Sequence, residues 1–272
     1  MTESPPKAGV IGWPVEHSKS PIIHGHWLAE HGLPGDYVHI PISPADFASR
    51  LKGLEAEGFV GANVTIPHKE NALHLADKAS DRAVAIGAAN TLVFKDGQIF
   101  ADNTDAEGFL NNLRAGAPDW NPAAGLALIL GAGGAARAIV YALKSAGVAD
   151  IMISNRTQSR ADALAQEFGV STVPWPDIST ATKKAMTVVN TTSLGMTGQP
   201  PLEIMLEGTQ DTLVTDIVYA PLETALLAQA RDRGMAAVDG LGMLLHQAVP
   251  GFEAWFGVRP TVTPELRKKV LA

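Results

Sequence analysis

A glycine-rich segment carries the clearest chemical signal in the chain. The apolar run at residues 126–130 leads directly into Gly131-Ala132-Gly133-Gly134-Ala135-Ala136, and an apolar helical pattern follows. Between a strand and a helix, the first glycine of such a segment permits a tight turn and the second lets the backbone approach a pyrophosphate, while the small Ala136 allows close packing. A merely structural turn is the alternative, and a second strand expected at residues 151–154 disfavours it. The segment predicts a dinucleotide-binding site.

The residues that follow this second strand indicate which dinucleotide binds. An Asp or Glu here would bind the adenosine 2′-hydroxyl of NAD, whereas an arginine accommodates the 2′-phosphate of NADP. The chain has no carboxylate at this point but carries Asn155, Arg156, Thr157 and Arg160. Guanidinium groups bind a phosphate dianion through paired hydrogen bonds. A solvated turn in which Asn155 or Thr157 caps the next helix is the alternative, and the pattern favours NADP.

Polar clusters in the N-terminal third of the chain supply a second kind of chemistry. A dehydrogenase that acts on an alcohol needs a group to exchange the hydroxyl proton and polar groups to fix the reacting carbon. Candidates occur at residues 17–21, 63–69, 87–91 and 102–105, each where a strand is expected to end. Because ligands of α/β sheets bind beyond the carboxyl ends of the strands, these clusters predict a substrate site.

Several of these residues also have a simple structural interpretation. Ser18 and Ser20 could cap the helix that starts near Pro21, and of the two Ser20 is the better placed. Asp105 could cap the helix that follows it. Lys69 could be one more surface lysine. The residue types alone leave these alternatives open.

Other polar residues in the same region allow equally simple interpretations. Asn63 and Thr65 could be polar residues of an edge strand, and Asn90 could occupy a left-handed turn. His24 and His26 lie two apart on an expected helix and do not share a face, so they are poor metal ligands. No metal site is predicted.

The apolar patterns arrange the chain as two successive βα series. Strands are expected at residues 8–12, 37–42, 60–66, 91–95, 98–101, 126–130, 151–154, 185–190, 213–217 and 236–238. Helices are expected at residues 22–31, 46–57, 107–113, 135–147, 159–168, 222–233, 241–256 and 264–271. The dipeptide Asp96-Gly97 predicts a tight hairpin turn.

Length and pattern together predict an α/β protein of two domains, since the chain has 272 residues and a domain has roughly 150. The first βα series, residues 1–106, is expected to be an α/β substrate domain. The second, residues 107–242, is expected to be a Rossmann-type NADP-binding domain.

The composition of the chain excludes several kinds of partner and chemistry. With 21 Lys and Arg against 28 Asp and Glu, the net charge is −7, which argues against a nucleic-acid partner. The absence of cysteine removes disulfides, thiolate nucleophiles and cysteine-bound metals. There is no signal-peptide pattern, and the most apolar run falls far short of the roughly 20 residues that span a bilayer. A cytoplasmic monomer or homodimer without a membrane partner is expected.

Seven motifs, in order, resemble those of the shikimate/quinate dehydrogenase family. They lie at residues 13–21, 63–69, 87–91, 102–105, 131–136, 155–157 and 239–247. The resemblance covers residues 8–256. It implies that a returning segment at 243–272 completes the first domain, and that the active site lies in the cleft between the two domains. It implies NADPH-dependent, reversible reduction of 3-dehydroshikimate to shikimate, a step towards chorismate and the aromatic amino acids.

The resemblance also implies roles for individual residues. Lys69 and Asp105 correspond to the catalytic pair, without indicating which of them donates the proton. The substrate set that it implies is Ser18, Ser20, Asn63, Thr65, Lys69, Asn90, Asp105, Tyr219 and Gln247. The cofactor set that it implies is Gly131, Ala132, Gly133, Gly134, Ala135, Asn155, Arg156, Thr157, Arg160, Thr192, Ile217 and Gly240. Hydroxyl and amide side chains suit a substrate rich in hydroxyl groups because they both donate and accept hydrogen bonds.

Two rival functions remain open at this point. A quinate dehydrogenase, or one of broader quinate/shikimate specificity, would have a similar sequence, although the Asn155-Arg156-Thr157 motif weighs against NAD-preferring members. A non-catalytic dinucleotide-sensing module could share the fold, because a fold alone does not determine function. The presence of both Lys69 and Asp105 argues against a sensor, which needs no proton-transfer pair.

Overall fold

The computed structural model describes residues 5–272, and the chain divides into two compact units. The first comprises the residues up to Thr104 together with Leu245–Ala272, and the second is Asp105–Leu244. The boundaries predicted from the sequence, at residues 106 and 243, lie close to these junctions. The functional assignment of each unit stays a prediction.

The first unit is built on a mixed six-stranded sheet of order β2-β1-β3-β5-β6-β4. Its strands are β1 (Lys7–Gly12), β2 (Asp36–Pro41), β3 (Phe59–Val64), β4 (Lys78–Ala79), β5 (Thr91–Lys95) and β6 (Gln98–Asp102). Strands β1, β2 and β3 are parallel, whereas β5 runs antiparallel to both β3 and β6. Asn63 therefore pairs with Thr91, and Thr91 pairs with Asp102. This register brings the start of β5 beside the ends of β3 and β6.

Local sequence explains the β5–β6 hairpin. Asp96 and Gly97 both have positive φ angles, 55° and 72°. This is the conformation of the two central residues of a type I′ turn, which matches the twist of the flanking strands. The hairpin predicted from Asp96-Gly97 is confirmed.

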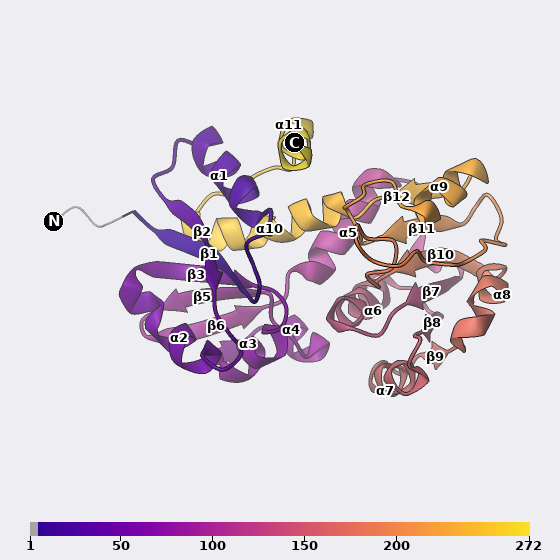
Figure 1. The fold of residues 1–272 in the computed structure, drawn as a ribbon, viewed down its shortest axis with the longest axis horizontal. Helices are drawn as coiled ribbons and strands as arrows, with labels where there is room; N and C mark the ends of the chain where they lie inside the picture. The colour runs from indigo at the N-terminus through magenta and orange to yellow at the C-terminus, as the bar shows by residue number, and fades with distance from the viewer. Residues whose placement is uncertain (1–4) are drawn as a thin grey trace. The chain divides into compact units, whose positions relative to one another are not determined.

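Helices cover both faces of the first sheet (Figure 1). The helices of this unit are α1 (Ser20–Glu30), α2 (Phe47–Gly53), α3 (Lys69–Leu75), α4 (Asp81–Ile86), the later part of α10 (Leu241–Phe256) and α11 (Pro264–Leu271). Phe47 of α2 and Ala72 of α3 belong to the apolar core on one face. Trp255 of α10 packs with Val10 and Tyr37 on the other face.

The short elements of this unit depart from the sequence predictions. The helix expected at residues 46–57 divides into α2 and a 3₁₀ turn at Glu55–Glu57. The turn ends at Gly58, which has a φ of 88°. Helices α3 and α4 and strand β4 were not predicted, because elements of two to seven residues are too short to show a hydrophobic period.

The second unit is built on a six-stranded parallel sheet of order β12-β11-β10-β7-β8-β9. Its strands are β7 (Leu126–Leu130), β8 (Ile151–Ser154), β9 (Ser171–Thr172), β10 (Ala185–Asn190), β11 (Leu213–Asp216) and β12 (Ala236–Val238). The chain moves outward from β7 to β9, then returns to the other side of β7 and continues to β12. The strand order therefore reverses between β7 and β10, which is where dinucleotides bind in sheets of this kind.

Helices cover both faces of the second sheet as well (Figure 1). Its helices are α5 (Asp105–Gly116), α6 (Gly134–Ala146), α7 (Gln158–Phe168), α8 (Ile178–Thr182) and α9 (Ala225–Asp232), with 3₁₀ turns at Pro122–Ala124 and Trp175–Asp177. Ile178 of α8 and Leu227 of α9 pack on Leu128 and Val188 of the sheet. Helix α9 begins later than the predicted residue 222 because the Thr224 side chain caps it, accepting a hydrogen bond from the Leu227 amide.

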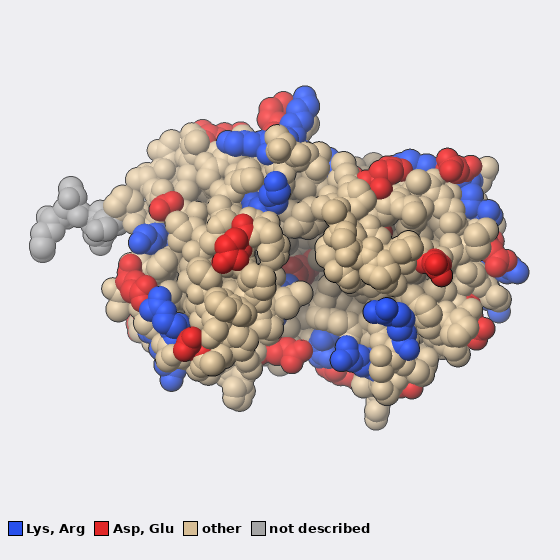
Figure 2. Space-filling model, viewed as in Figure 1, with Lys and Arg blue, Asp and Glu red and all other residues tan. Residues whose placement is uncertain are grey.

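The surface carries both signs of charge. On the face drawn in Figure 2, Lys and Arg side chains are interspersed with Asp and Glu side chains. Among residues 5–272, none of the helices combines the length and the apolar character needed to cross a bilayer.

Candidate active site

The polar clusters of the first unit gather at one edge of its sheet. Asn63 is the penultimate residue of β3, Thr65 follows that strand, and Asn90 immediately precedes the antiparallel β5. Ser18 lies between β1 and α1. The β3–β5 register thus places clusters that are separated in sequence next to each other.

Three structural alternatives raised by the sequence are wrong. Asn63 lies in β3, which has neighbours on both sides and is no edge strand. Asp96 is the one non-glycine residue with positive φ in the described part of the chain, so Asn90 does not occupy a left-handed turn. The residue at the N-cap of α1 is Lys19, without a side-chain hydrogen bond, and Ser20 is the first helical residue. Ser18 Oγ does accept a hydrogen bond from the Ser20 amide at 3.3 Å, but from one residue before the cap position.

Buried amide side chains form the centre of this cluster. Asn90 Nδ2 donates a hydrogen bond to Gln247 Oε1 at 3.2 Å, although the two residues are far apart in sequence. Asn63 Nδ2 donates to the Asn90 carbonyl at 3.2 Å. All three side chains are buried. Since buried amides have fixed partners, the network holds its polar atoms in fixed positions.

Two members of the network were missed in the sequence. Thr104 is fully buried; its amide donates to Asn90 Oδ1 at 2.8 Å and its hydroxyl to the Gln247 carbonyl at 2.8 Å. The position of Thr104 inside the polar run at residues 102–105 was the available signal. Tyr37 donates its hydroxyl hydrogen to Asn63 Oδ1 at 2.6 Å. No local pattern distinguishes Tyr37 from an ordinary strand residue.

Lys69 is the first residue of α3 and is partly buried. Its carbonyl accepts a hydrogen bond from the Ala89 amide at 2.9 Å, which ties the start of α3 to the segment before Asn90. The preceding residue, His68, has helical backbone conformation and caps the start of α3. Its buried ring stacks on Phe47 at 4.2 Å and contacts the Ile42 carbonyl at 2.7 Å. His68 therefore anchors the helix that carries Lys69.

Asp105 is the first residue of α5 and belongs to the second unit. Its side chain is buried, with an exposed fraction of 7%. It follows Thr104 directly, so the backbone that leads to it is held by the hydrogen bonds to Asn90 and Gln247.

The glycine segment of the second unit has the geometry that its sequence implies. Gly131 has a φ of 113°, and a Cβ there would lie 2.4 Å from Thr191 Oγ1, so only glycine fits. At Gly133 and Gly134 a Cβ would meet no atom within 4 Å. Ala132 lies in the loop, Ala135 lies in the first turn of α6, and Ala136 is fully buried. The loop thus leaves open space at the N-terminus of α6, where an anion is favoured.

The candidate 2′-phosphate residues lie beside this loop. Leu130 pairs with Ser154, and the Gly131 amide donates to the Ser154 carbonyl at 2.7 Å. Arg156 and Arg160 are exposed, and neither forms an ion pair with any residue the structure describes. The capping alternative is wrong, because Thr157 precedes α7 without a side-chain cap and Asn155 donates to the Thr157 carbonyl at 3.0 Å. Both guanidinium groups are available to an anion.

The ends of β10 and β11 are joined by a buried network centred on Asp216. Its carboxylate accepts hydrogen bonds from Asn190 Nδ2 at 2.9 Å, the Val218 amide at 3.0 Å and Thr224 Oγ1 at 2.8 Å. Burial raises the pKa of Asp216 to about 6, although these three hydrogen bonds lower it. The Thr192 amide and hydroxyl both donate to Asn190 Oδ1. The network therefore fixes the loops after both strands.

The remaining candidates of the second unit follow β11 and β12. Ile217 donates its amide hydrogen to the Asn190 carbonyl at 3.1 Å. A Cβ at Gly240 would lie 2.3 Å from the Ile217 carbonyl oxygen, so Gly240 permits close backbone contact. Tyr219 is partly exposed, and burial raises the pKa of its hydroxyl.

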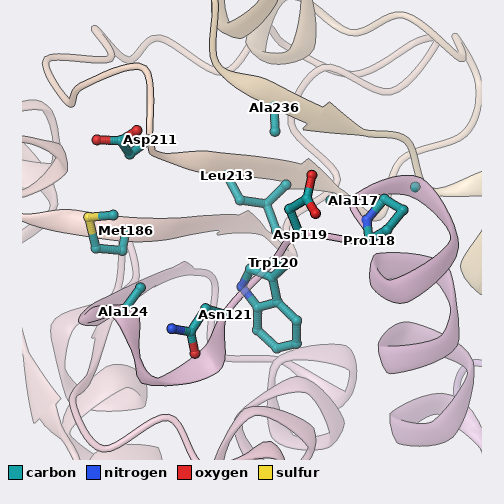
Figure 3. A pocket seen from close by; sticks show the side chains of 11 residues that line it. Ala117, Pro118, Asp119, Trp120, Asn121, Ala124, Met186, Asp211, Leu213 and Ala236 are labelled. Carbon is teal, nitrogen blue, oxygen red and sulfur yellow. The ribbon is translucent and has the colours of Figure 1, made fainter.

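A cavity of about 520 Å³ lies at the amino ends of the strands of the second sheet, at the end opposite to the glycine loop (Figure 3). Met186 near the start of β10, Leu213 at the start of β11 and Ala236 at the start of β12 line it, together with Trp120. These are the amino ends of parallel strands, whereas the glycine loop follows a carboxyl end. The cavity is thus separate from the candidate cofactor residues.

Taken together, the parallel sheet and the glycine loop beside its switch point define an α/β protein with a Rossmann-type dinucleotide-binding unit. Three family models match the chain: shikimate dehydrogenase substrate binding domain at residues 10–92, shikimate/quinate 5-dehydrogenase at 121–214, and shikimate 5′-dehydrogenase C-terminal domain at 240–264. The chain belongs to the shikimate dehydrogenase family.

Individual relatives agree with this assignment. The chain is 56% identical to the shikimate dehydrogenase (NADP(+)) of Paracoccus denitrificans, over 98% of this chain and 96% of the relative. It is 38% identical, with a TM-score of 0.85, to the shikimate 5-dehydrogenase of Thermus thermophilus solved with NADP(H) and shikimate, over 97% and 98% of the two chains. A quinate dehydrogenase from Corynebacterium glutamicum, solved with NAD, is 33% identical with a TM-score of 0.91, over 97% and 98%.

Proposed function

We propose that the protein catalyses the NADPH-dependent, reversible reduction of 3-dehydroshikimate to shikimate. The observation that carries this proposal is the buried network of Asn63, Asn90 and Gln247 at the strand ends, tied through the Ala89 amide to the start of α3 at Lys69. This arrangement suits a small substrate rich in hydroxyl groups. The 56% identity to an NADP(+) shikimate dehydrogenase supports the same substrate and cofactor.

The residues of the second unit fit NADP. The pyrophosphate of NADP fits the open space beside Gly133 and Gly134, because these residues lie at the N-terminus of α6, where an anion is favoured. Arg156 and Arg160 are exposed and without ion-pair partners in the described chain, and they suit the 2′-phosphate. When bound, NADPH supplies the hydride for the carbonyl carbon. We propose that the other residues of the cofactor set line the glycine loop or contact the nicotinamide half of NADP. They are Ala132, Ala135, Asn155, Thr157, Thr192, Ile217 and Gly240.

Lys69 and Asp105 are proposed to handle the proton. As the carbonyl oxygen gains negative charge, the Lys69 ammonium can donate a proton to it or stabilise it electrostatically. Asp105 can hydrogen-bond the reacting oxygen and orient the ammonium. We propose that Ser18, Ser20, Asn63, Thr65, Asn90, Tyr219 and Gln247 bind the ring substituents.

The proposal extends to organisation and place in metabolism. We propose the first unit as the substrate domain and the second as the NADP-binding domain. The enzyme is proposed to act in the cytoplasm, as a monomer or homodimer, on the route to chorismate and the aromatic amino acids. Sedimentation of the purified protein measures the oligomeric state directly.

Quinate oxidation is the second candidate function, because the fold of the quinate dehydrogenase superposes with a TM-score of 0.91. One experiment separates the two. The purified protein is assayed with shikimate and with quinate, each with NADP and with NAD, giving four values of kcat/KM. The proposal expects the highest value for shikimate with NADP. A higher value for quinate would overturn the substrate assignment, and no turnover with any pair would indicate a non-catalytic module.

A further inference from the structure

A buried tyrosine contacts one of the proposed substrate residues of the first unit. Tyr37 is the second residue of β2, and its side chain has an exposed fraction of only 5%. Its hydroxyl lies 2.6 Å from Asn63 Oδ1 and donates to it. A buried hydroxyl with so short a hydrogen bond fixes the atom that accepts it.

The Tyr37 hydroxyl keeps its proton. Burial raises the pKa of Tyr37 well above its ordinary value, so the phenol stays neutral and remains a donor to Asn63. The Asn63 side chain therefore has a fixed donor on one side of its Oδ1 atom.

The hydrogen bonds of Asn63 determine what its side chain can offer a ligand. Both amide hydrogens are donated within the protein, to the Asn90 carbonyl at 3.2 Å and to Thr91 Oγ1 at 3.3 Å. The Tyr37 hydroxyl occupies one of the two acceptor positions on Oδ1. The remaining capacity of Asn63 is one acceptor position on Oδ1, which suits a substrate hydroxyl.

An aromatic cluster holds Tyr37 in this position. The buried ring of His24 stacks on the Tyr37 ring with a centroid distance of 4.0 Å and an interplanar angle of 8°. The Trp255 ring packs against both of these rings, with centroid distances of 5.9 Å to Tyr37 and 5.5 Å to His24. Burial lowers the pKa of His24 to about 3, so the ring that supports Tyr37 is neutral at physiological pH.

We propose that Tyr37 is a positioning residue for substrate binding, holding the Asn63 amide in its binding orientation through its own buried hydroxyl. The inference rests on the proposed function, because Asn63 is a substrate residue only under that assignment. Tyr37 acts through the Asn63 side chain.

Tyr37→Phe tests the proposal because it removes one oxygen atom and keeps the ring that stacks on His24. We expect KM for shikimate to rise about 5- to 10-fold, the factor that corresponds to losing one hydrogen bond. We expect kcat to stay within about threefold and the Kd for NADP to be unchanged, because chemistry and cofactor binding use other groups. Tyr141→Phe, which removes the same atom from a partly exposed tyrosine of α6, is the matched control.

A double-mutant cycle separates positioning from a loss of structure. In an Asn63→Ala background, Tyr37→Phe should raise KM less than about twofold, because the side chain through which it acts is gone. If Tyr37→Phe lowers the urea midpoint markedly, Tyr37→Met, which also lacks the hydroxyl but adapts its shape, repeats the comparison.

The outcomes are distinguishable from those of the proposed function. A parent enzyme that oxidises shikimate, together with a Tyr37→Phe variant of parental KM, overturns the positioning role and leaves the function intact. A fall in kcat at constant KM, or a full effect of Tyr37→Phe in the Asn63→Ala background, also overturns it. A parent without activity on shikimate overturns the proposed function, and this inference with it.

Discussion

The buried carboxylate of Asp216 provides a prediction whose size follows from the structure. The side chain is 1% exposed, and burial raises its pKa from 3.8 to about 6 in spite of three hydrogen bonds. The folded protein therefore holds this proton more tightly than the unfolded chain does. Stability falls as pH rises from about 4 to about 6, and the loss is complete above the folded pKa. At 1.36 kcal/mol per pKa unit, the ionised carboxylate costs about 1.5–3 kcal/mol at pH 7.

Asp216→Asn removes this cost with little change of shape. The asparagine Oδ1 can still accept from Asn190 and the Val218 amide, as Asp216 Oδ1 does. Its Nδ2 can donate to the Thr224 hydroxyl, which now donates to Asp216 Oδ2. Since all three contacts persist, we expect the variant to match the parent near pH 4 and to exceed its free energy of unfolding by about 1.5–3 kcal/mol at pH 7.

Urea unfolding followed by circular dichroism at pH 4, 5.5 and 7 measures this difference. Asp119→Asn, at an exposed position of the same unit, is the control and should change stability by less than about 0.5 kcal/mol at every pH. An Asp216→Asn variant that is less stable than the parent at pH 7, or a difference that does not change with pH, would refute the reasoning. The first result would mean that the charge of Asp216 stabilises the fold, and the second that folding does not raise its pKa.

Three further changes test the proposed site. Lys69→Ala should lower kcat at least about 100-fold, the lower range of general acid–base assistance, with an unchanged Kd for NADP; a kcat within about threefold of the parent would remove Lys69 from proton transfer. Arg156→Ala should weaken NADP about 10- to 150-fold in a fluorescence titration, because a charge-assisted contact to phosphate is worth about 1.5–3 kcal/mol, and an unchanged NADP/NAD ratio would contradict this assignment. Gly131→Ala should lower the free energy of unfolding more than Gly147→Ala does: both have positive φ, but a Cβ meets Thr191 Oγ1 at 2.4 Å only at the first, and equal losses would show that this contact relaxes freely.

The sequence by itself predicted the elements whose cause is local. Strands β7, β8, β10 and β12 begin and end at the predicted residues, because short apolar runs bounded by polar or glycine residues are sufficient to define them. The glycine loop, the Asp96-Gly97 turn and helices α10 and α11 were also predicted, because short stretches of neighbouring residues determine them. Gly131 needs its backbone conformation wherever the loop occurs, so its role was visible before any tertiary contact was known.

Only the tertiary structure decided how the polar residues of the first unit meet. The antiparallel insertion of β5 between β3 and β6 brings Asn90 beside Asn63, and no local pattern encodes strand order. The hydrogen bond from Asn90 to Gln247 joins the residue just before β5 to a residue of α10. The two are close only after the sheet and the returning helix have packed. Tyr37 is the strongest case: its ring looks like any strand aromatic in the sequence, and its hydroxyl gains a role because burial places it against Asn63.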